Sequence, residues 1–241
     1  MYSPHTAGES KLGYLYQSRY ALLRALRDGK KNPALSISIE KFDDVAFEQD
    51  DRPIELIQTK HHVKPGDTGD KSVDVWKTLK IWIEFIESDP NTVSNTRFVF
   101  LTTNTAAESS ALSFLKPHES FRDIHKAKDY LVTAASTSEN KKTETARKSF
   151  LALDDAQKLL LLASVWVFDN AQNISGVRQE IEEELFYSAP EGMIGQLTDY
   201  LEGWWFNRVI GALSGESADS IPVNSIQSKI YEIIESFKSG K

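Results

Sequence analysis

Two short stretches in the N-terminal half carry side chains that together could hydrolyse a phosphodiester. They read Ile39-Glu-Lys-Phe-Asp-Asp-Val-Ala-Phe-Glu48 and Glu55-Leu-Ile-Gln-Thr-Lys60. Residues two apart in a β-strand share a face, so Gln58 and Lys60 are expected to project together. Asp44 begins the preceding strand, and residues 50–53 (Asp-Asp-Arg-Pro) are a turn signal. A hairpin through this turn would bring Asp44 beside Gln58 and Lys60.

A carboxylate, a carboxamide and an ammonium are groups that metal-assisted hydrolysis uses. A divalent ion holds a water and offsets the charge that builds on the phosphate, and Mg²⁺ prefers a few oxygen ligands. Asp44 offers a carboxylate oxygen and Gln58 a side-chain oxygen, with the Thr59 carbonyl nearby. Lys60 could orient the attacking water and stabilise the developing charge. The sequence does not reveal strand register, so Asp43 is an alternative to Asp44 as the metal ligand.

The composition indicates a folded chain without thiol chemistry. Its 241 residues, 40% of them hydrophobic, allow one large domain or two small ones. The absence of cysteine excludes disulfides and thiolate metal sites and suits a reducing compartment. No apolar run approaches the ~20 residues that span a bilayer, and the N-terminus lacks the regions of a signal peptide. We therefore expect a cytoplasmic protein with no membrane partner.

The net charge of −7 is unusual for a protein that grips DNA alone. Such proteins generally show a basic footprint, because Lys and Arg neutralise phosphates. If this chain binds nucleic acid, its basic residues must cluster on one face, or partner subunits must provide some of the contacts to DNA.

Hydrophobic spacing predicts an α/β arrangement around the candidate residues. The expected elements are a helix over 11–27, strands over 35–39, 45–47 and 54–61, a helix capped by Ser72 and stopped by Asp89-Pro90-Asn91, and a strand over 97–102. The order helix, three strands, helix, strand implies a sheet flanked by helices.

A polar stretch divides this N-terminal part, residues 1–133, from a mostly helical part, residues 150–241. Residues 134–149 are rich in Ser, Thr, Lys and Glu, and we predict a linker or exposed loop there. Beyond it we expect a helix capped by Asp154 or Asp155, a short strand over 165–168, a helix capped by Ser175, a long helix over 193–213 and a final helix rich in Ile.

Adjacent pairs constrain two further interpretations. His61 and His62 would point to opposite faces of a strand, so they cannot chelate one metal together. With Lys64 they are candidates for phosphate contacts, or plain surface residues. Trp204 and Trp205 lie about 100° apart on a helix, so one can enter the core while the other faces elsewhere. Either a second subunit covers the other face, or the core stripe is wide.

Short stretches in the N-terminal half resemble, in order, the DNA endonuclease domain of CD-NTase-associated effectors. They are Gly13-Tyr-Leu-Tyr-Gln17, Ile39-Glu40, Asp43-Asp44, Gln58-Thr-Lys60-His61 and Ser72-Val-Asp74-Val-Trp76, within residues 9–104. That domain is a branch of the PD-(D/E)xK nucleases in which glutamine often replaces the acidic residue of (D/E)xK. The resemblance implies a restriction-endonuclease-like core and Mg²⁺-dependent (or Mn²⁺-dependent) cleavage of double-stranded DNA.

The resemblance assigns roles residue by residue. It gives the metal role to Asp44, the motif roles to Gln58 and Lys60, and a supporting site role to Gln17, with Glu40 as a further candidate ligand. Gln17 could equally lie on a solvated helix face. At position 58 this chain has glutamine where the wider superfamily has an acidic residue. Because a neutral amide binds metal less strongly than a carboxylate, this difference bears directly on the metal affinity.

A second resemblance lies in the C-terminal third. Leu201-Glu-Gly-Trp-Trp205, followed by Val209-Ile210, resembles the C-terminal region of effectors in ABC three-component systems. Nuclease and tail together are similar to the nuclease subunit of Lamassu-type bacterial antiphage defence. That similarity implies a bacterial cytoplasmic effector with an SMC-like ATPase and a further subunit as partners. It also implies a homo-oligomer on activation, with Trp204 and Trp205 as interface candidates.

Two other functions compete with a DNA endonuclease. The acidic net charge, the neutral Gln58 and the helical C-terminal third favour a non-catalytic assembly or sensor subunit that keeps a nuclease fold. An enzyme acting on RNA or on single strands is also compatible with the sequence.

Overall fold

The computed structural model describes residues 4–89, 93–118, 120 and 122–239. The chain is mixed α/β, as expected, and divides into two compact units. Unit 1 comprises Met1–Ile54 with Gln172–Lys241, and unit 2 comprises Glu55–Ala171. Both ends of the chain therefore contribute to one unit, in contrast to the expected parts 1–133 and 150–241. Among the described residues, no helix is both long and apolar enough to cross a bilayer.

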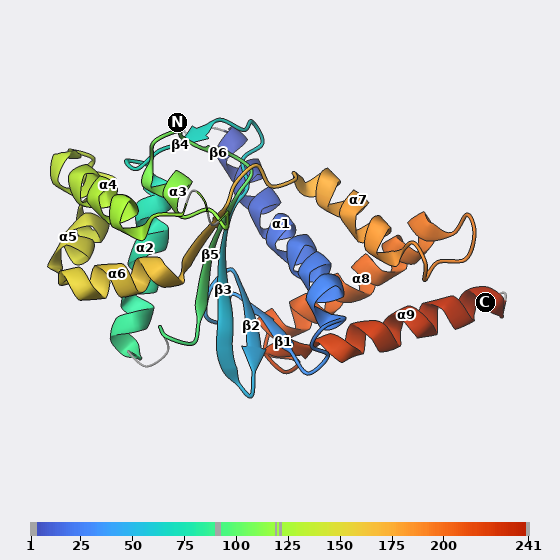
Figure 1. Ribbon diagram of the computed structural model, residues 1–241. Coiled ribbons are helices and arrows are strands. Elements are labelled where there is room, and N and C mark those ends of the chain that lie inside the picture. Colours follow the sequence, from blue (N-terminus) through green and yellow to red (C-terminus); the bar gives the residue numbers. More distant parts are fainter. Residues whose placement is uncertain (1–3, 90–92, 119, 121, 240–241) are drawn as a thin grey trace. The chain divides into compact units, whose positions relative to one another are not determined.

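Unit 1 combines a small antiparallel sheet with four helices (Figure 1). Its elements are α1 (Pro4–Gly29), β1 (Ser36–Ile39), β2 (Val45–Gln49), the start of β3 (Arg52–Lys60), α7 (Ile174–Leu185), α8 (Ile194–Leu213), β8 (Ser220–Pro222) and α9 (Val223–Lys238). Strand β1 pairs with both β2 and β8, and Ile37 lies between Phe47 and Ile221. These three side chains are almost completely buried, so they anchor the apolar side of the sheet.

A tight turn joins β2 to β3, where the sequence predicted one. The connection consists of Asp50 and Asp51, with φ angles of 52° and 60°. Positive φ at both central residues is the type I′ geometry of two-residue hairpin loops, and Asp tolerates it better than most residues. Strand β3 begins two residues earlier than the expected position 54 and includes Pro53. It is also the element within which the two units divide.

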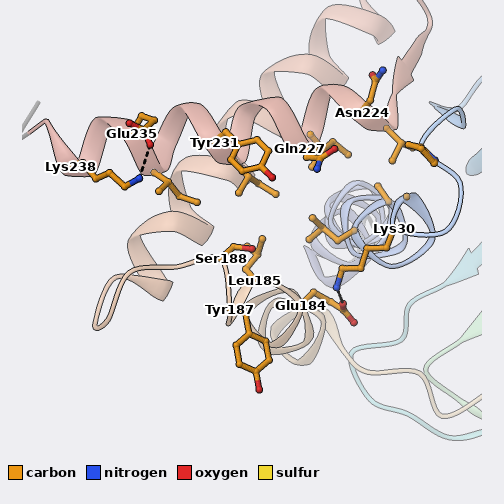
Figure 2. Close-up of a pocket in the computed structure, with 18 residues that line it drawn as sticks. Lys30, Glu184, Leu185, Tyr187, Ser188, Asn224, Gln227, Tyr231, Glu235 and Lys238 are labelled. Atoms are coloured by element: carbon orange, nitrogen blue, oxygen red, sulfur yellow. Dashed lines mark hydrogen bonds and ion pairs between the residues drawn. The ribbon is translucent and has the colours of Figure 1, made fainter.

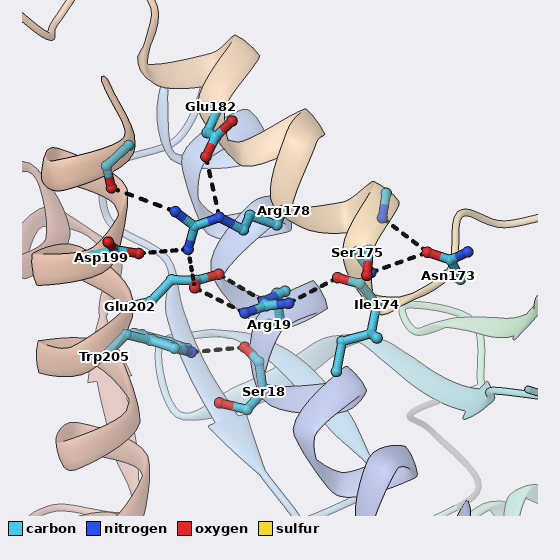
Figure 3. Close-up of polar contacts among 12 residues, drawn as sticks. Ser18, Arg19, Asn173, Ile174, Ser175, Arg178, Glu182, Asp199, Glu202 and Trp205 are labelled. Atoms are coloured by element: carbon cyan, nitrogen blue, oxygen red, sulfur yellow. Dashed lines mark hydrogen bonds and ion pairs between the residues drawn. The ribbon is translucent and has the colours of Figure 1, made fainter. Parts of the chain in front are cut away.

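An ion-pair network ties α1, α7 and α8 together (Figure 3). Arg19 Nε lies 2.7 Å from Glu202 Oε1, and Arg178 Nη1 lies 3.1 Å from Glu202 Oε2. Arg178 also pairs with Asp199 and Glu182. Because one carboxylate on α8 joins arginines from two other helices, the network fixes the register of these helices against one another.

Unit 2 contains parallel strands with helices on one side. Its elements are the rest of β3, β4 (Asp67–Thr68), α2 (Val73–Ser88), β5 (Arg97–Thr102), β6 (Thr105–Ala106), α3 (Ala111–Phe114), α4 (Ile124–Thr137), a 3₁₀ turn (Lys141–Thr143), α5 (Glu144–Ala152), α6 (Asp155–Ser164) and β7 (Val165–Phe168). Strand β5 pairs in parallel with β3 and β7, and β4 pairs with β6. Parallel neighbours need a crossover, which α2 provides between β3 and β5. Figure 1 shows α2, α4, α5 and α6 on the same side of β5.

Two of the three predicted helix caps are confirmed, whereas α1 begins at Pro4 rather than at the expected position 11. Ser72 caps α2 by accepting from the Asp74 N–H at 3.2 Å, and Asp154, rather than Asp155, forms a capping box with Gln157. The Ser175 cap was wrong, because Asn173 accepts from the N–H groups of both Ser175 and Gly176. One carboxamide oxygen there satisfies two free donors. Helix α2 ends at Ser88, and Pro90 and Asn91 of the predicted stop lie outside the described residues.

The predicted linker at 134–149 is instead folded. Helix α4 runs to Thr137, and α5 begins at Glu144 after the 3₁₀ turn. The reason is Arg147, which is 9% exposed and donates to the Ala135 carbonyl at 2.7 Å and the Thr143 hydroxyl at 3.1 Å. The polar composition suggested a solvated segment. Instead, the buried guanidinium donates hydrogen bonds to a backbone and a side-chain oxygen and so links α4 to α5.

Trp205 and Trp204 provide a matched test of packing in unit 1. The Trp205 side chain is 1% exposed, and its Nε1 donates to the Ser18 carbonyl of α1 at 2.7 Å, whereas Trp204 is half-buried. We expect Trp205→Phe to lower the free energy of unfolding by about 2–3 kcal/mol, because a buried carbonyl loses its donor. Trp204→Phe should lower it by less than about 1 kcal/mol. Urea denaturation measures both, and equal losses would contradict this packing.

Candidate functional site

Gln58 and Lys60 project from the same face of β3, as the sequence predicted. Lys60 Nζ donates to Gln58 Oε1 at 2.6 Å. Gln58 is 4% exposed, whereas Lys60 is half-buried at the carboxyl end of the strand. A short charge-assisted bond of this kind orients both groups. The ammonium is therefore held in place without a carboxylate, so its positive charge is not neutralised by this partner.

The chain just after β5 holds the end of β3 in place. The Lys60 carbonyl accepts from the Thr103 N–H and from the Thr102 hydroxyl, each at 3.2 Å. The Thr103 hydroxyl accepts from the His62 N–H at 2.8 Å and donates to the His62 carbonyl at 3.2 Å. Both backbone groups of His62 are thus bonded to one side chain, which fixes where the chain leaves the sheet.

Asn104 orders the loop that follows. Its Nδ2 donates to the Thr68 hydroxyl at 2.9 Å, and its Oδ1 accepts from the Gly66 N–H at 3.0 Å. The segment between β3 and α2 thereby gains the short strand β4, which pairs with β6. Ligands of α/β sheets generally bind outside the carboxyl ends of parallel strands, which is where these residues lie.

His62 faces a carboxylate from the first turn of α2. Its Nε2 lies 3.3 Å from Asp74 Oδ2, and each side chain is about one third exposed, at 33% and 34%. Hydrogen bonding with His62, aided by the charges of Lys60 and Lys77, lowers the pKa of the Asp74 carboxyl despite its partial burial. The amino end of a helix also favours a negative charge. Asp74 is therefore ionised at neutral pH.

The other two residues predicted to contact phosphate differ in exposure. His61 is half-buried, and burial together with the charge of His62 lowers the pKa of its imidazole, so His61 is neutral at neutral pH. Lys64 is exposed in the loop between β3 and β4. Their contact with nucleic acid stays a prediction.

The carboxylates of the first stretch lie in unit 1, in the loop between β1 and β2. The Glu40 N–H donates to the Asp44 carbonyl at 3.2 Å, and the Asp44 N–H donates to Asp43 Oδ1 at 2.9 Å. Asp43 is 7% exposed and Asp44 is half-buried. Glu40 is exposed, with φ at 59°, a region that residues with a β-carbon seldom occupy and that recurs at functional sites.

Gln17 lies on α1, also in unit 1, and is 8% exposed. Its burial excludes the solvated helix face considered from the sequence. Its Oε1 has no hydrogen-bond partner among the described residues. A buried acceptor left in this way is normally satisfied by water or by a bound ion.

A metal at these residues would need water or phosphate to complete its coordination. Among the described residues, no group of three or more His, Asp or Glu side chains is placed to hold a metal ion. Mg²⁺ is commonly held by only one or two carboxylates, with waters and substrate phosphates filling the rest. The donors available, carboxylate and carboxamide oxygens with no thiolate, fit Mg²⁺ or Mn²⁺ held in that way.

Sequence reasoning missed the residues that position the site in unit 2. Asp74, Thr103 and Asn104 were given no role, although Asp74 is part of the Ser72-Val-Asp74 helix start. Their partners lie twelve or more positions away along the chain, and such pairings depend on the parallel register of β3 and β5. A short polar run directly after a buried strand, Thr102-Thr-Asn104, was the available signal.

A groove of about 770 Å³ in unit 1 is separate from these residues (Figure 2). Ile226, Ile230 and Ile234 of α9 line one side of it, and the ends of α1 and α7 line the other. Its rim charges are paired, since Lys30 Nζ lies 2.6 Å from Glu184 and Lys238 Nζ lies 2.7 Å from Glu235.

Comparison with known proteins gave a likeness of fold. No family model matches the chain, and neither does a curated protein. A solved structure of the Moraxella osloensis Cap4 SAVED/CARF-domain containing receptor is similar, with a TM-score of 0.50 and 18% identity over 93% of this chain. The match covers 48% of the receptor, so this chain spans about half of its length. At that identity the likeness concerns the fold alone.

Proposed function

We propose that this protein is a Mg²⁺-dependent endonuclease that cleaves double-stranded DNA. The observation that carries the proposal is the Gln58–Lys60 pair, in which Lys60 Nζ is held 2.6 Å from Gln58 Oε1 at the carboxyl end of β3. Two further findings support it. Apart from the two-residue strand β4, the element order α1, β1, β2, β3, α2, β5 agrees with the predicted helix, three strands, helix, strand, and the motifs along these elements resemble PD-(D/E)xK nucleases of the glutamine-containing branch.

Each residue has a distinct chemical role in this proposal. The Gln58 side-chain oxygen and a carboxylate from the loop between β1 and β2 would hold the ion, with Glu40 as a further candidate ligand. The ion, when bound, supplies charge neutralisation at the phosphate and an acidified water. Lys60 orients the attacking water and stabilises charge on the phosphoryl oxygens. Gln17 supports the site through its buried acceptor oxygen.

The strand geometry favours Asp43 over Asp44 as the carboxylate. Ile39 pairs with Val45, and the Glu40 N–H bonds to the Asp44 carbonyl, so Asp44 continues the alternation of β2. Its side chain should therefore lie on the face opposite Val45 and Phe47. A two-residue type I′ loop makes Phe47 and Ile54 cross-strand neighbours on one face.

The same alternation along β3 puts Ile54, Leu56, Gln58 and Lys60 on one face. Within unit 1, Asp44 is expected on the face of β2 opposite Val45 and Phe47. We therefore assign the metal-binding carboxylate to Asp43, which is buried and precedes the regular strand. Asp44, whose N–H donates to Asp43 Oδ1, then orients that carboxylate.

The biological setting that we propose is bacterial antiphage defence. The N-terminal motifs resemble effector nucleases of that kind, and the fold is similar to a SAVED/CARF-domain containing receptor. The signature around Trp204 and Trp205 adds a resemblance to Lamassu-type effectors. The partners in this proposal are an SMC-like ATPase, a further subunit and additional copies of the chain, in a bacterial cytoplasm.

A non-catalytic assembly or sensor subunit is the second candidate function. It is favoured by the neutral Gln58 and by the absence, among the described residues, of three acidic or His groups gathered around one point. Under this alternative the purified chain never cleaves DNA, alone or with its partners, but still forms stable assemblies. DNA cleavage that depends on Lys60 would refute this alternative.

Lys60→Ala tests the proposed nuclease directly. We expect plasmid cleavage with Mg²⁺ to fall by about 10²–10³-fold, because a positioned cation next to the reacting phosphate is lost. Lys148→Ala, at a lysine that is 73% exposed and lies on α5, should cleave like wild type. Unchanged cleavage by Lys60→Ala would refute the assignment of the catalytic site to Gln58 and Lys60. Single-stranded DNA and RNA in the same assay identify the nucleic acid that is cut.

Asp43→Asn and Asp44→Asn separate the two candidate carboxylates. Asp43→Asn should slow cleavage by about 10²-fold or more and raise the Mg²⁺ concentration needed for half-maximal rate, because an amide binds the ion less strongly than a carboxylate. Asp44→Asn should retain cleavage within about 10-fold, since its carboxylate is expected on the opposite face. The reverse pattern would return the ligand role to Asp44.

Self-association can be tested on α8. Phe206, Ile210 and Leu213 are 44%, 45% and 56% exposed and lie on one side of the helix. We expect Phe206→Glu with Ile210→Glu to reduce the oligomer seen by size-exclusion chromatography with light scattering, in the presence of DNA and partners. Leu160→Glu, on α6 and 46% exposed, is the matched control. A lone monomer for wild type in both resting and DNA-activated states would refute assembly.

A further inference from the structure

We propose that His62, held by the Asp74 carboxylate, donates a proton to the departing sugar oxygen during phosphodiester cleavage. This inference rests on the proposed endonuclease function and adds a proton donor to it. It concerns residues of unit 2 only, at the carboxyl end of β3. Asp74 is a positioning residue in this scheme, and His62 is the group that meets the reacting atoms.

The position of His62 is defined by contacts from both sides. The Thr103 hydroxyl bonds to both backbone groups of His62, at 2.8 and 3.2 Å, and Asp74 Oδ2 lies 3.3 Å from the imidazole Nε2. His62 follows Lys60 by two residues on a chain segment whose Lys60 carbonyl is also bonded. With 33% of its side chain exposed, His62 is accessible to a polymeric substrate.

A carboxylate faces the His62 ring, among cationic groups. Asp74 from α2 stands directly against the ring, and its pKa is lowered, so its carboxylate persists at neutral pH. The cationic groups nearby are Lys60 on β3 and Lys77, one turn along α2 from Asp74. Lys60 donates to Gln58, and the neighbouring His61 has a lowered pKa, whereas His62 is the imidazole that lies against a carboxylate.

The proton balance of the step is simple. An imidazolium carries a proton on each ring nitrogen. Because Nε2 of His62 lies 3.3 Å from Asp74 Oδ2, the proposal assigns the transferable proton to Nδ1. As the water oxygen bonds to phosphorus and the bond from phosphorus to the sugar oxygen breaks, that oxygen takes the Nδ1 proton. The attacking water releases one proton to solvent, and the imidazole regains one from solvent.

A leaving-group substitution tests proton donation separately from phosphate binding. Sulfur in place of the departing sugar oxygen is a much weaker base, so it leaves without being protonated. We expect His62→Asn to slow single-turnover cleavage of the ordinary duplex by about 10²–10⁴-fold, but to slow the sulfur-substituted duplex by less than about 10-fold. An equal loss on both duplexes would overturn the proposal and make His62 a phosphate contact. His125→Asn, at an exposed histidine of α4, is the control.

Asp74→Asn tests the positioning role through the pH profile. A proton donor makes the rate fall as pH rises, because its protonated form is lost. Removing the adjacent negative charge disfavours an imidazolium, so the alkaline fall should move to lower pH. Asp129→Asn, at a carboxylate that is 74% exposed, should leave the profile unchanged. An unshifted profile for Asp74→Asn would show that Asp74 does not act through His62.

Failure of this inference is distinguishable from failure of the proposed function. If wild type does not cut DNA, or if Lys60→Ala cuts as well as wild type, the endonuclease proposal itself is wrong. If cutting requires Lys60 while His62→Asn cleaves the ordinary duplex at the wild-type rate, only the proton-donor role is overturned. Circular dichroism of each variant confirms that the rates compare folded proteins.

Discussion

The Lys60 carbonyl, at the end of β3, accepts hydrogen bonds from Thr102 and Thr103 at the end of β5. The positions of the Gln58, Lys60 and His62 side chains depend on these two bonds. Because side chains alternate along a strand, holding the Lys60 backbone also determines the face that Gln58 shares with it. The Thr103 hydroxyl extends the constraint to His62. Catalytic groups are effective when supporting residues hold them close to their working geometry. Here the support comes from threonines buried beside a parallel strand pair.

The neutral partner of Lys60 changes the electrostatics of the site. A carboxylate at position 58 would compensate the ammonium and bind a cation strongly. The carboxamide does neither, so in the proposed function ion binding would rely more on the other carboxylate and on the substrate. An ion held in this way would be recruited together with the phosphate, since each would supply part of the binding of the other. The proposed site would then have little affinity for metal in the absence of nucleic acid.

Local patterns in the sequence predicted the elements well, and contacts between distant segments account for what they missed. The turn at Asp50–Asp51, the Ser72 cap and the shared face of Gln58 and Lys60 follow from residue type and spacing alone. Arg147 shows the opposite case, because its polar surroundings imply solvent until helices α4 and α5 are brought together around it. The link between His62 and Asp74 likewise depends on how α2 returns along the strands. The assignments of Asp43, Asp44, Gln58 and Glu40 to a metal site, of Gln17 to a supporting role and of Lys64 to DNA stay predictions.

An overall charge of −7 makes weak binding of isolated copies to DNA a physical expectation. Each phosphate contact by Lys or Arg gains affinity through the release of counterions, and few such contacts are available around His62, Lys60, Lys64 and Lys77. Repulsion from the remaining acidic surface acts against them over about 8–10 Å at physiological salt. Assembly changes the balance, because several copies add their local cations along one duplex and raise the effective concentration of each site. If the chain is the endonuclease proposed above, an isolated copy would bind DNA weakly, and neighbouring copies on the same duplex would bind it, and cut it, more strongly.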